Sequence, residues 1–286
     1  TLEQLKSGEL KGSTQLKLSC DLSEFPKEIF ELSDTLELLD LSGNKLASLP
    51  TDFGKLKKLK IAFFSDNLFE QLPEVLSDCP VLEMIGFKSN RISVVTEKSI
   101  PKTTRWLILT NNCITELPTG IGNCSRLQKV AFAGNKLKCL PVEMVNCKNL
   151  ELLRISANEL TEFPAWLLSL PRLSWLAFAG NKFNRSPAIH DHFKAIPWDD
   201  LIIEEQLGEG ASGVISKAHF KANPDHQIAV KVFKGEVTSD GLPHDEMNAC
   251  IEADVHDNLV KVIGKVFGHP LSKETLVLEL IPAEYK

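Results

Sequence analysis

The chain has 286 residues, of which 43% are hydrophobic and 24% are charged. This composition indicates a soluble globular protein rather than a disordered one, and the length favours about two domains. Lys and Arg number 32 against 38 Asp and Glu, and the net charge of −6 argues against nucleic acid as the main partner. The longest unbroken apolar run, residues 175–179, is too short to span a membrane.

A leucine-rich pattern recurs along the first two thirds of the chain, and its clearest copy is L-E-L-L-D-L-S-G-N-K-L-A-S-L-P at residues 36–50. Its Asn returns every 23 residues, with one spacing of 22, at Asn44, Asn67, Asn90, Asn112, Asn135, Asn158 and Asn181. Each copy predicts a short strand with inward leucines, a bend at the Asn, and a helix or helical bend after the Pro. The pattern therefore predicts a curved α/β leucine-rich-repeat solenoid, whose turns must stack because none buries its apolar edge alone.

The two ends of the predicted solenoid are less regular than its middle. Residues 1–19 hold a short amphipathic start and a first strand, which we interpret as an N-terminal capping turn. At the other end the consensus fails at Ser186, and residues 187–194 predict a closing helix. We therefore place the leucine-rich-repeat domain at residues 1–195 and a second domain at residues 196–286.

The seven cysteines form no C-x-x-C pair and no zinc-like spacing, so we expect no metal site. Cys79, Cys124 and Cys147 each lie 12 residues after a repeat Asn, where a small apolar side chain fits the buried outer side of the turn. We interpret them as free core thiols, which predicts a reducing, cytoplasmic location.

The concave face is the surface that a solenoid uses for binding. On each predicted strand, two residues point to this face, six and four positions before the Asn. The first column holds Leu38, Ile61, Met84, Trp106, Lys129, Leu152 and Trp175. The second column holds Asp40, Phe63, Gly86, Ile108, Ala131, Arg154 and Ala177.

These two columns are apolar and aromatic rather than charged, which is typical of a surface that binds a protein partner. The residues predicted to bind the partner are Phe63, Met84, Trp106, Ile108, Arg154 and Trp175. The alternative is that the second domain covers this stripe, or that its exposure is merely tolerated.

A different pattern begins at Ile196. Residues 201–207 alternate like a strand and lead into G-E-G-A-S-G-V-I at residues 208–215, which is a G-x-G-x-x-G motif. Alone the motif is weak, because a dinucleotide-binding fingerprint has the same glycines but opens a helix at the last one. Here a second predicted strand, residues 214–220, follows instead. The glycines therefore lie in a hairpin whose backbone N–H groups can close over phosphates.

A third predicted strand, residues 227–233, carries Lys231 within an apolar run, where an unpaired ammonium would be costly. A helix predicted from Pro243 to Asp254 offers the carboxylate of Glu246, and a nucleotide phosphate could supply further negative charge. The alternative, an edge-strand lysine that reaches solvent, is disfavoured by the glycine hairpin upstream and by Glu246 downstream.

In this order the motifs resemble the small lobe of a eukaryotic-type protein kinase. The matching residues are Gly208, Gly210 and Gly213 with Ile215, the I-A-V-K strand ending at Lys231, Glu246, H-D-N-L-V-K-V-I-G at 256–264, and L-V-L-E-L-I at 276–281. The arrangement of repeats before kinase resembles bacterial leucine-rich-repeat serine/threonine protein kinases. The resemblance implies an α+β fold for the second domain, with an antiparallel sheet and one helix.

The resemblance also implies the residues that bind ATP. The loop of Gly208, Gly210, Ser212 and Gly213 would cover the phosphates, Ile215 and Ala229 would sandwich the adenine, and Lys231 would pair with the α- and β-phosphates while Glu246 holds it. Leu278 would be the gatekeeper, and the backbone of Glu279 and Ile281 would bond the adenine edge. The spacing from Glu246 to His256 is one residue longer than in many kinases, so Glu252 is an alternative partner.

The resemblance implies an ATP-dependent serine/threonine protein kinase whose repeats bind protein partners or substrates. The chain stops at Lys286, before any catalytic H-R-D Asp, Asn for magnesium or D-F-G motif. We therefore expect a fragment of a longer kinase that does not transfer phosphate alone. A non-catalytic adaptor or pseudokinase and a host-directed bacterial effector are the alternatives.

Overall fold

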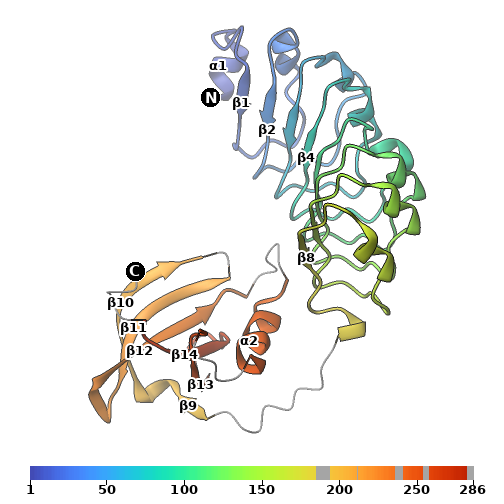
Figure 1. Cartoon of the computed structure of the whole chain (residues 1–286). Helices are drawn as coiled ribbons and strands as arrows, with labels where there is room; N and C mark the ends of the chain where they lie inside the picture. The colour runs from blue at the N-terminus through green and yellow to red at the C-terminus, as the bar shows by residue number, and fades with distance from the viewer. Residues whose placement is uncertain (185–193, 211, 236–240, 254–257, 282–286) are drawn as a thin grey trace. The chain divides into compact units, whose positions relative to one another are not determined.

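The structure is a computed structural model, and it describes residues 1–184, 194–210, 212–235, 241–253 and 258–281. The chain divides into two compact units, Thr1–Asn184 and Arg185–Lys286 (Figure 1). Strand β9 (Ala195–Pro197), which spans the boundary predicted between residues 195 and 196, belongs to the sheet of the second unit. The closing helix predicted over residues 187–194 falls, except for Lys194, outside the described residues.

Eight short strands form one parallel sheet in chain order in the first unit. They are β1 (Gln15–Lys17), β2 (Leu38–Asp40), β3 (Ile61–Phe63), β4 (Met84–Gly86), β5 (Trp106–Ile108), β6 (Lys129–Ala131), β7 (Leu152–Arg154) and β8 (Trp175–Ala177). Figure 1 shows them side by side along the inner edge of the curved unit. In β2, for example, the middle residue Leu39 is buried and its two neighbours are partly exposed. The predicted solenoid and its alternation are confirmed.

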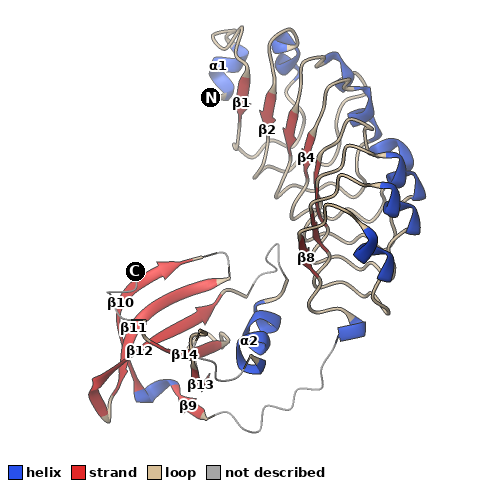
Figure 2. Cartoon of the chain, viewed as in Figure 1, coloured by secondary structure: helices blue, strands red, loops and turns tan. Residues whose placement is uncertain are grey.

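Short 3-10 helices line the outer side of the first unit (Figure 2). They are η1 (Lys27–Leu32), η2 (Phe53–Lys55), η3 (Glu74–Asp78), η4 (Glu97–Ser99), η5 (Thr119–Asn123), η6 (Val142–Asn146), η7 (Ala165–Ser169) and η8 (Lys182–Asn184). Within the described part of this unit, the α-helical segment is α1 (Leu2–Lys6), at the N-terminus. Of the two forms predicted for the outer side, a helix or a helical bend, the structure shows short 3-10 helices. These outer segments of three to six residues have the tighter 3-10 geometry, which is common in short helical pieces.

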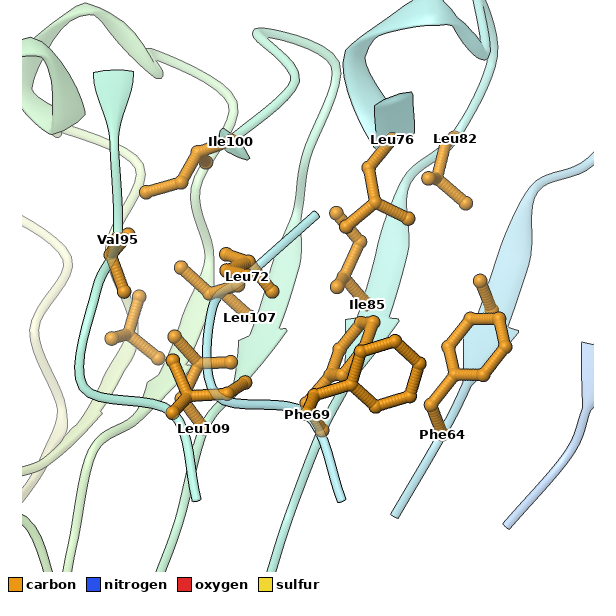
Figure 3. Close-up of a cluster of buried hydrophobic side chains, with 14 of the residues drawn as sticks. Phe64, Phe69, Leu72, Leu76, Leu82, Ile85, Val95, Ile100, Leu107 and Leu109 are labelled. Atoms are coloured by element: carbon orange, nitrogen blue, oxygen red, sulfur yellow. The ribbon is translucent and has the colours of Figure 1, made fainter. Parts of the chain in front are cut away.

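One apolar core lies between the strands and the 3-10 helices. Figure 3 shows part of it, where Phe64 and Phe69 pack edge to face with ring centroids 5.7 Å apart. The predicted core thiols are confirmed, since Cys79, Cys124 and Cys147 are buried and unpaired. Burial raises the pKa of the Cys79 thiol to about 12 and that of Cys147 to about 11.

The repeat asparagines bind the backbone of neighbouring turns. Asn112 is representative: its Oδ1 accepts from the N–H of Ile92 at 3.0 Å, and its Nδ2 donates to the carbonyls of Phe87 at 2.9 Å and Leu109 at 3.0 Å. The residue before each Asn has a positive φ, which is 57° at Asn111. Each Asn therefore satisfies buried backbone groups that the sharp bend would leave without partners.

The described residues of the second unit form a six-stranded sheet, in the spatial order β10-β11-β12-β14-β13-β9, and one α-helix. Its further elements are η9 (Trp198–Asp200), β10 (Leu201–Glu209), β11 (Gly213–Phe220), β12 (Asn223–Phe233), α2 (Pro243–Glu252), β13 (Val262–Phe267) and β14 (Thr275–Glu279). Neighbouring strands from β10 to β13 are antiparallel, but β9 pairs with β13 in parallel. The predicted antiparallel sheet is thus corrected to a mixed one. A Cβ atom at Gly264 would lie 2.4 Å from the carbonyl oxygen of Lys194, so the glycine allows β9 to approach.

Apolar residues cover both faces of this sheet. On one face, Val230 and Val277 pack with Ile196 of β9. On the other face, Phe233 and Leu276 pack against α2. No helix among the described residues of either unit is long and apolar enough to cross a membrane.

Candidate functional site

The predicted adenine-binding and phosphate-binding side chains share one face of the second sheet. Ile215 of β11 lies opposite Lys231 of β12, and Ala229 of β12 lies opposite Leu278 of β14. Residues directly opposite each other on antiparallel strands point to the same face. Alternate residues of one strand do so too, and this is the face that α2 covers. The register therefore brings four of the predicted site residues together.

Lys231 and Glu246 form an ion pair between β12 and α2, in which Lys231 Nζ donates to Glu246 Oε1. The lysine side chain is only 14% exposed, whereas that of the glutamate is 41% exposed. The ring centroid of Phe233 lies 4.8 Å from Lys231 Nζ, which adds a second favourable contact to the ammonium. The carboxylate that balances the buried lysine is thus Glu246. The side chain of Glu252, the alternative, lies outside the described residues.

The glycine hairpin connects β10 and β11, and its glycines differ in their surroundings. A Cβ atom at Gly213 would lie 2.6 Å from the carbonyl oxygen of Val232, so the close strand crossing requires glycine there. Apart from the adjoining residues, no atom of the described chain lies within 4 Å of a Cβ built at Gly208 or Gly210. The packing of the chain itself therefore does not require glycine at these two positions, and the space beside them is open.

Lys234 ties this hairpin to the end of β12, a feature that the sequence analysis missed. Its Nζ lies 2.7 Å from Glu209 Oε1 and donates to the carbonyl of Gly210 at 3.0 Å. Its backbone N–H donates to the carbonyl of Ser212 at 2.9 Å. The hydrogen bond from Lys234 holds the pKa of Glu209 below its usual value. Antiparallel pairing with β11 predicts that β12 ends beside the hairpin, but the partners of Lys234 depend on the strand register.

The segment predicted to meet the adenine edge is only partly described. The backbone N–H of Glu279 donates to the carbonyl of Lys261 at 3.0 Å, so this donor is already used. Ile281 is the last described residue and is 45% exposed. His256 and Asp257, from the motif after α2, lie outside the described residues.

The concave face of the repeats carries cations stacked on tryptophan rings. Lys129 Nζ lies 4.1 Å from the ring centroid of Trp106, and the guanidinium carbon of Arg154 lies 5.6 Å from that of Trp175. Trp175 is nevertheless 52% exposed. The two columns were predicted to be mainly apolar and aromatic, and the contacts show that their two cations, Lys129 and Arg154, lie on the tryptophan rings.

The other predicted partner-binding residues lie on neighbouring strands of the same face. Met84 lies opposite Trp106 in the parallel register, and Ile108 ends the same strand as Trp106. Phe63 lies over Gly86, where a Cβ atom would be 2.6 Å from the Cδ1 atom of the ring. The six predicted residues thus lie on the strands β3 to β8 of one sheet.

Two hollows lie apart from these residues. One lies on the outer side of the repeats, between η3 and η5, and includes Asp78, Lys98 and Cys124 in its lining. The other lies beside β9 and is lined by residues that include Lys194 and Phe220. Across the part of the chain that the structure describes, no group of three or more His, Cys, Asp and Glu side chains is placed to hold a metal ion.

Comparison with known proteins identifies the repeats. The leucine-rich-repeat family model matches residues 35–56. Among curated proteins, a leucine-rich repeat-containing G-protein coupled receptor 5 of Rattus norvegicus is 32% identical over 145 residues, which is 49% of this chain and 15% of that protein. A probable inactive serine/threonine-protein kinase, roco10 of Dictyostelium discoideum, is 30% identical over 124 residues, which is 42% of this chain and 5% of that protein. The chain thus spans a small part of these relatives.

Solved structures agree on the fold of the repeats. A leucine-rich-repeat protein of Leptospira interrogans superimposes with a TM-score of 0.59 at 28% identity, covering 64% of this chain and 47% of that one. An internalin of Listeria monocytogenes shares the fold, with a TM-score of 0.50 at 18% identity, covering 61% of this chain and 50% of that one. Proteins of this architecture use their extended concave surfaces to bind protein partners. The chain is a leucine-rich-repeat protein.

Proposed function

We propose that this protein is a serine/threonine protein kinase whose repeats bind a protein partner, and that residues 196–286 are its nucleotide-binding small lobe. The observation that carries this proposal is the ion pair of Lys231 with Glu246 on the sheet face that also holds Ile215 and Ala229. A largely buried lysine on a central strand needs an anionic partner, and a carboxylate from a packed helix leaves the ammonium charged and fixed in position. A fixed ammonium can pair with the phosphates of a nucleotide.

The residues of this face fit ATP. The open space beside Gly208 and Gly210 would admit phosphate oxygens, which the backbone N–H groups of the hairpin could bind. Ile215, Ala229 and Leu278 would give the adenine an apolar surface. ATP would supply the phosphoryl group that a kinase transfers, with magnesium as its counter-ion. Phosphoryl transfer also needs a catalytic base and magnesium ligands, so it is proposed for the whole protein and not for residues 196–286 alone.

The repeats would recruit the substrate or a regulator through the concave face. A second candidate function is that of a non-catalytic adaptor, which the exposed Trp175 favours because binding a partner through this face needs no nucleotide. All seven cysteines are free thiols, which supports the proposal of a cytoplasmic location.

An NMR titration of the chain with magnesium ATP tests the nucleotide site. We expect weak binding, at millimolar ATP, that shifts the amide signals of the glycine hairpin and of Ala229. Lys231→Met should abolish these shifts, because methionine keeps the length of the side chain and loses the charge. Lys221→Met, at an exposed lysine of the same unit, is the matched control and should leave them intact.

Two results of this titration would contradict the nucleotide site. If the amide shifts persist in Lys231→Met, Lys231 is not part of the nucleotide site. A complete lack of shifts at millimolar ATP would favour the adaptor.

A further inference from the structure

Several cations beside the concave face of the first repeats are neutralised by carboxylates of the chain itself. Lys17 Nζ lies 3.3 Å from Asp40, and Lys60 Nζ lies 2.9 Å from Glu37. Further along, Glu83 pairs with both Arg105 at 3.4 Å and Arg126 at 2.6 Å. These pairs leave little charge for a partner on this part of the sheet.

Lys129 differs from these cations. It lies at the start of β6, and its neighbours in register, Trp106 on β5 and Leu152 on β7, are both uncharged. No carboxylate of the described residues lies within ion-pair distance of its Nζ, which instead sits 4.1 Å from the centroid of the Trp106 ring. An ammonium has three donors, and contact with a ring face still leaves donors for an external acceptor.

The column that contains Lys129 continues with apolar side chains. Leu152 lies opposite Trp175 in the register of β7 and β8, so the order across four strands is Trp106, Lys129, Leu152 and Trp175. Neighbouring strands lie about 4.8 Å apart, so three strand spacings make roughly 14 Å. An extended peptide advances about 3.3 Å per residue and would cover this column with about five residues.

We propose that this column binds an extended segment of a protein partner in which an acidic residue is close to an apolar or aromatic one. The carboxylate would accept from Lys129 Nζ, and the apolar side chain would lie on Leu152 and the exposed face of Trp175. The proposal rests on the proposed protein-binding role of the repeats and adds the chemistry of the partner. Charge complementarity selects an acidic segment, because a basic one would bring a second cation to the unpaired Lys129.

A selection from a display library of random 12-residue peptides on the intact chain tests the proposal. The enriched peptides should contain Asp or Glu within two residues of an aliphatic or aromatic residue. Their affinity should fall about tenfold in Lys129→Gln, since a charge-assisted hydrogen bond is lost, and further in Lys129→Glu. Trp175→Ala should also weaken them. Lys148→Gln, at an exposed lysine outside the strands, is the matched control and should change nothing.

The outcomes separate this proposal from the one on which it rests. Peptides without an acidic bias that are still lost in Trp175→Ala would overturn the acidic partner and keep the concave face as the binding surface. Peptides that bind Lys129→Gln and Trp175→Ala as tightly as they bind the wild type would overturn both the acidic partner and the concave face as the binding surface. If no peptide is enriched, the proposal of an extended peptide segment is wrong. It is also wrong if the chain instead binds a single-stranded oligonucleotide selectively through Lys129. If a variant does not fold, the salt dependence of peptide binding to the wild type tests the proposal instead. The contact between Lys129 and an acidic residue must weaken in high salt, so an affinity that does not change with salt would overturn it.

Discussion

Lys234 and Glu209 join the end of β12 to the glycine hairpin, with Nζ and Oε1 2.7 Å apart. The same ammonium donates to the carbonyl of Gly210 at 3.0 Å. Both side chains are partly exposed, so their ion pair adds little to the stability of the whole unit. The effect of this ion pair is local, because it connects the glycine hairpin, which has open space on one side, to the central strand β12.

Replacing Lys234 with Met should free the hairpin without unfolding the unit. We expect faster amide hydrogen exchange at Gly210 and Gly213, and an unchanged melting temperature, because the lost contacts are local. Lys221→Met is the control. Exchange rates equal to those of the wild type would show that Lys234 does not restrain the hairpin.

The same tether should depend on pH. The hydrogen bond from Lys234 lowers the pKa of Glu209 from its ordinary value of 4.5. Because the folded value is depressed, the tether is fully present above pH 4.5 and is lost as the pH falls through the folded pKa. Hydrogen exchange of the hairpin, corrected for intrinsic rates, should therefore accelerate in that acidic range. Glu209→Gln should show the faster exchange already at pH 7, and a variant that keeps the acid transition would contradict this assignment.

The hydrogen bonds of the repeat asparagines predict that substitutions at two neighbouring asparagines change the stability of the first unit very differently. Asn112→Asp should destabilise the first unit by on the order of 3 kcal/mol, because a buried carboxylate would face the carbonyls of Phe87 and Leu109 in place of the donating amide. Asn111→Asp should cost less than about 0.5 kcal/mol, since this side chain is exposed and Asp66 already has the same backbone conformation, with φ 54°. Chemical denaturation measures both. Equal losses of unfolding free energy in the two variants would show that the hydrogen bonds of the repeat asparagines do not fix the turns.

The buried thiols should resist alkylation in the folded chain. Burial raises the pKa of Cys79 to about 12 and that of Cys147 to about 11, so at pH 8 almost none of either thiol is ionised. Iodoacetamide followed by peptide mass spectrometry should therefore modify the exposed Cys20 and Cys139 first. Modification of Cys79 at the rate of Cys20 would mean that the repeat core opens readily.

The regular part of the fold could be predicted because the residues of each repeat determine its own strand and its own bend. Apolar residues, most often leucine, at the inward positions and an Asn at each bend after β2 to β8 fix the strands and the turns. The outer elements could not be assigned as well, because an apolar segment such as Val142–Asn146 has a helical pattern, and five residues fit either geometry, as the α-helical α1 of equal length shows. Strand β9 was missed because three residues carry no readable alternation.

The candidate site could be predicted where the motif is local in sequence. The pairing of Lys231 with Glu246 followed from the cost of a buried ammonium, and the glycine hairpin followed from the strand after it. The contacts of Lys234 and the stacking of Lys129 on Trp106 join residues more than 20 positions apart, and they depend on strand register that the sequence does not show. The position of each of these lysines in the chain was visible, but its partner was not.

Covalent labelling with an acyl-phosphate derivative of ATP tests the nucleotide site at Lys231, because the reagent acylates a lysine that lies beside bound phosphates. We expect that Lys231 is labelled, that excess ATP protects it, and that Glu246→Gln reduces the labelling by releasing the lysine from its position. Lys217 and Lys221, which lie in the same unit, should react slowly and without protection. Equal labelling of all three lysines, unaffected by ATP, would contradict a nucleotide site at Lys231.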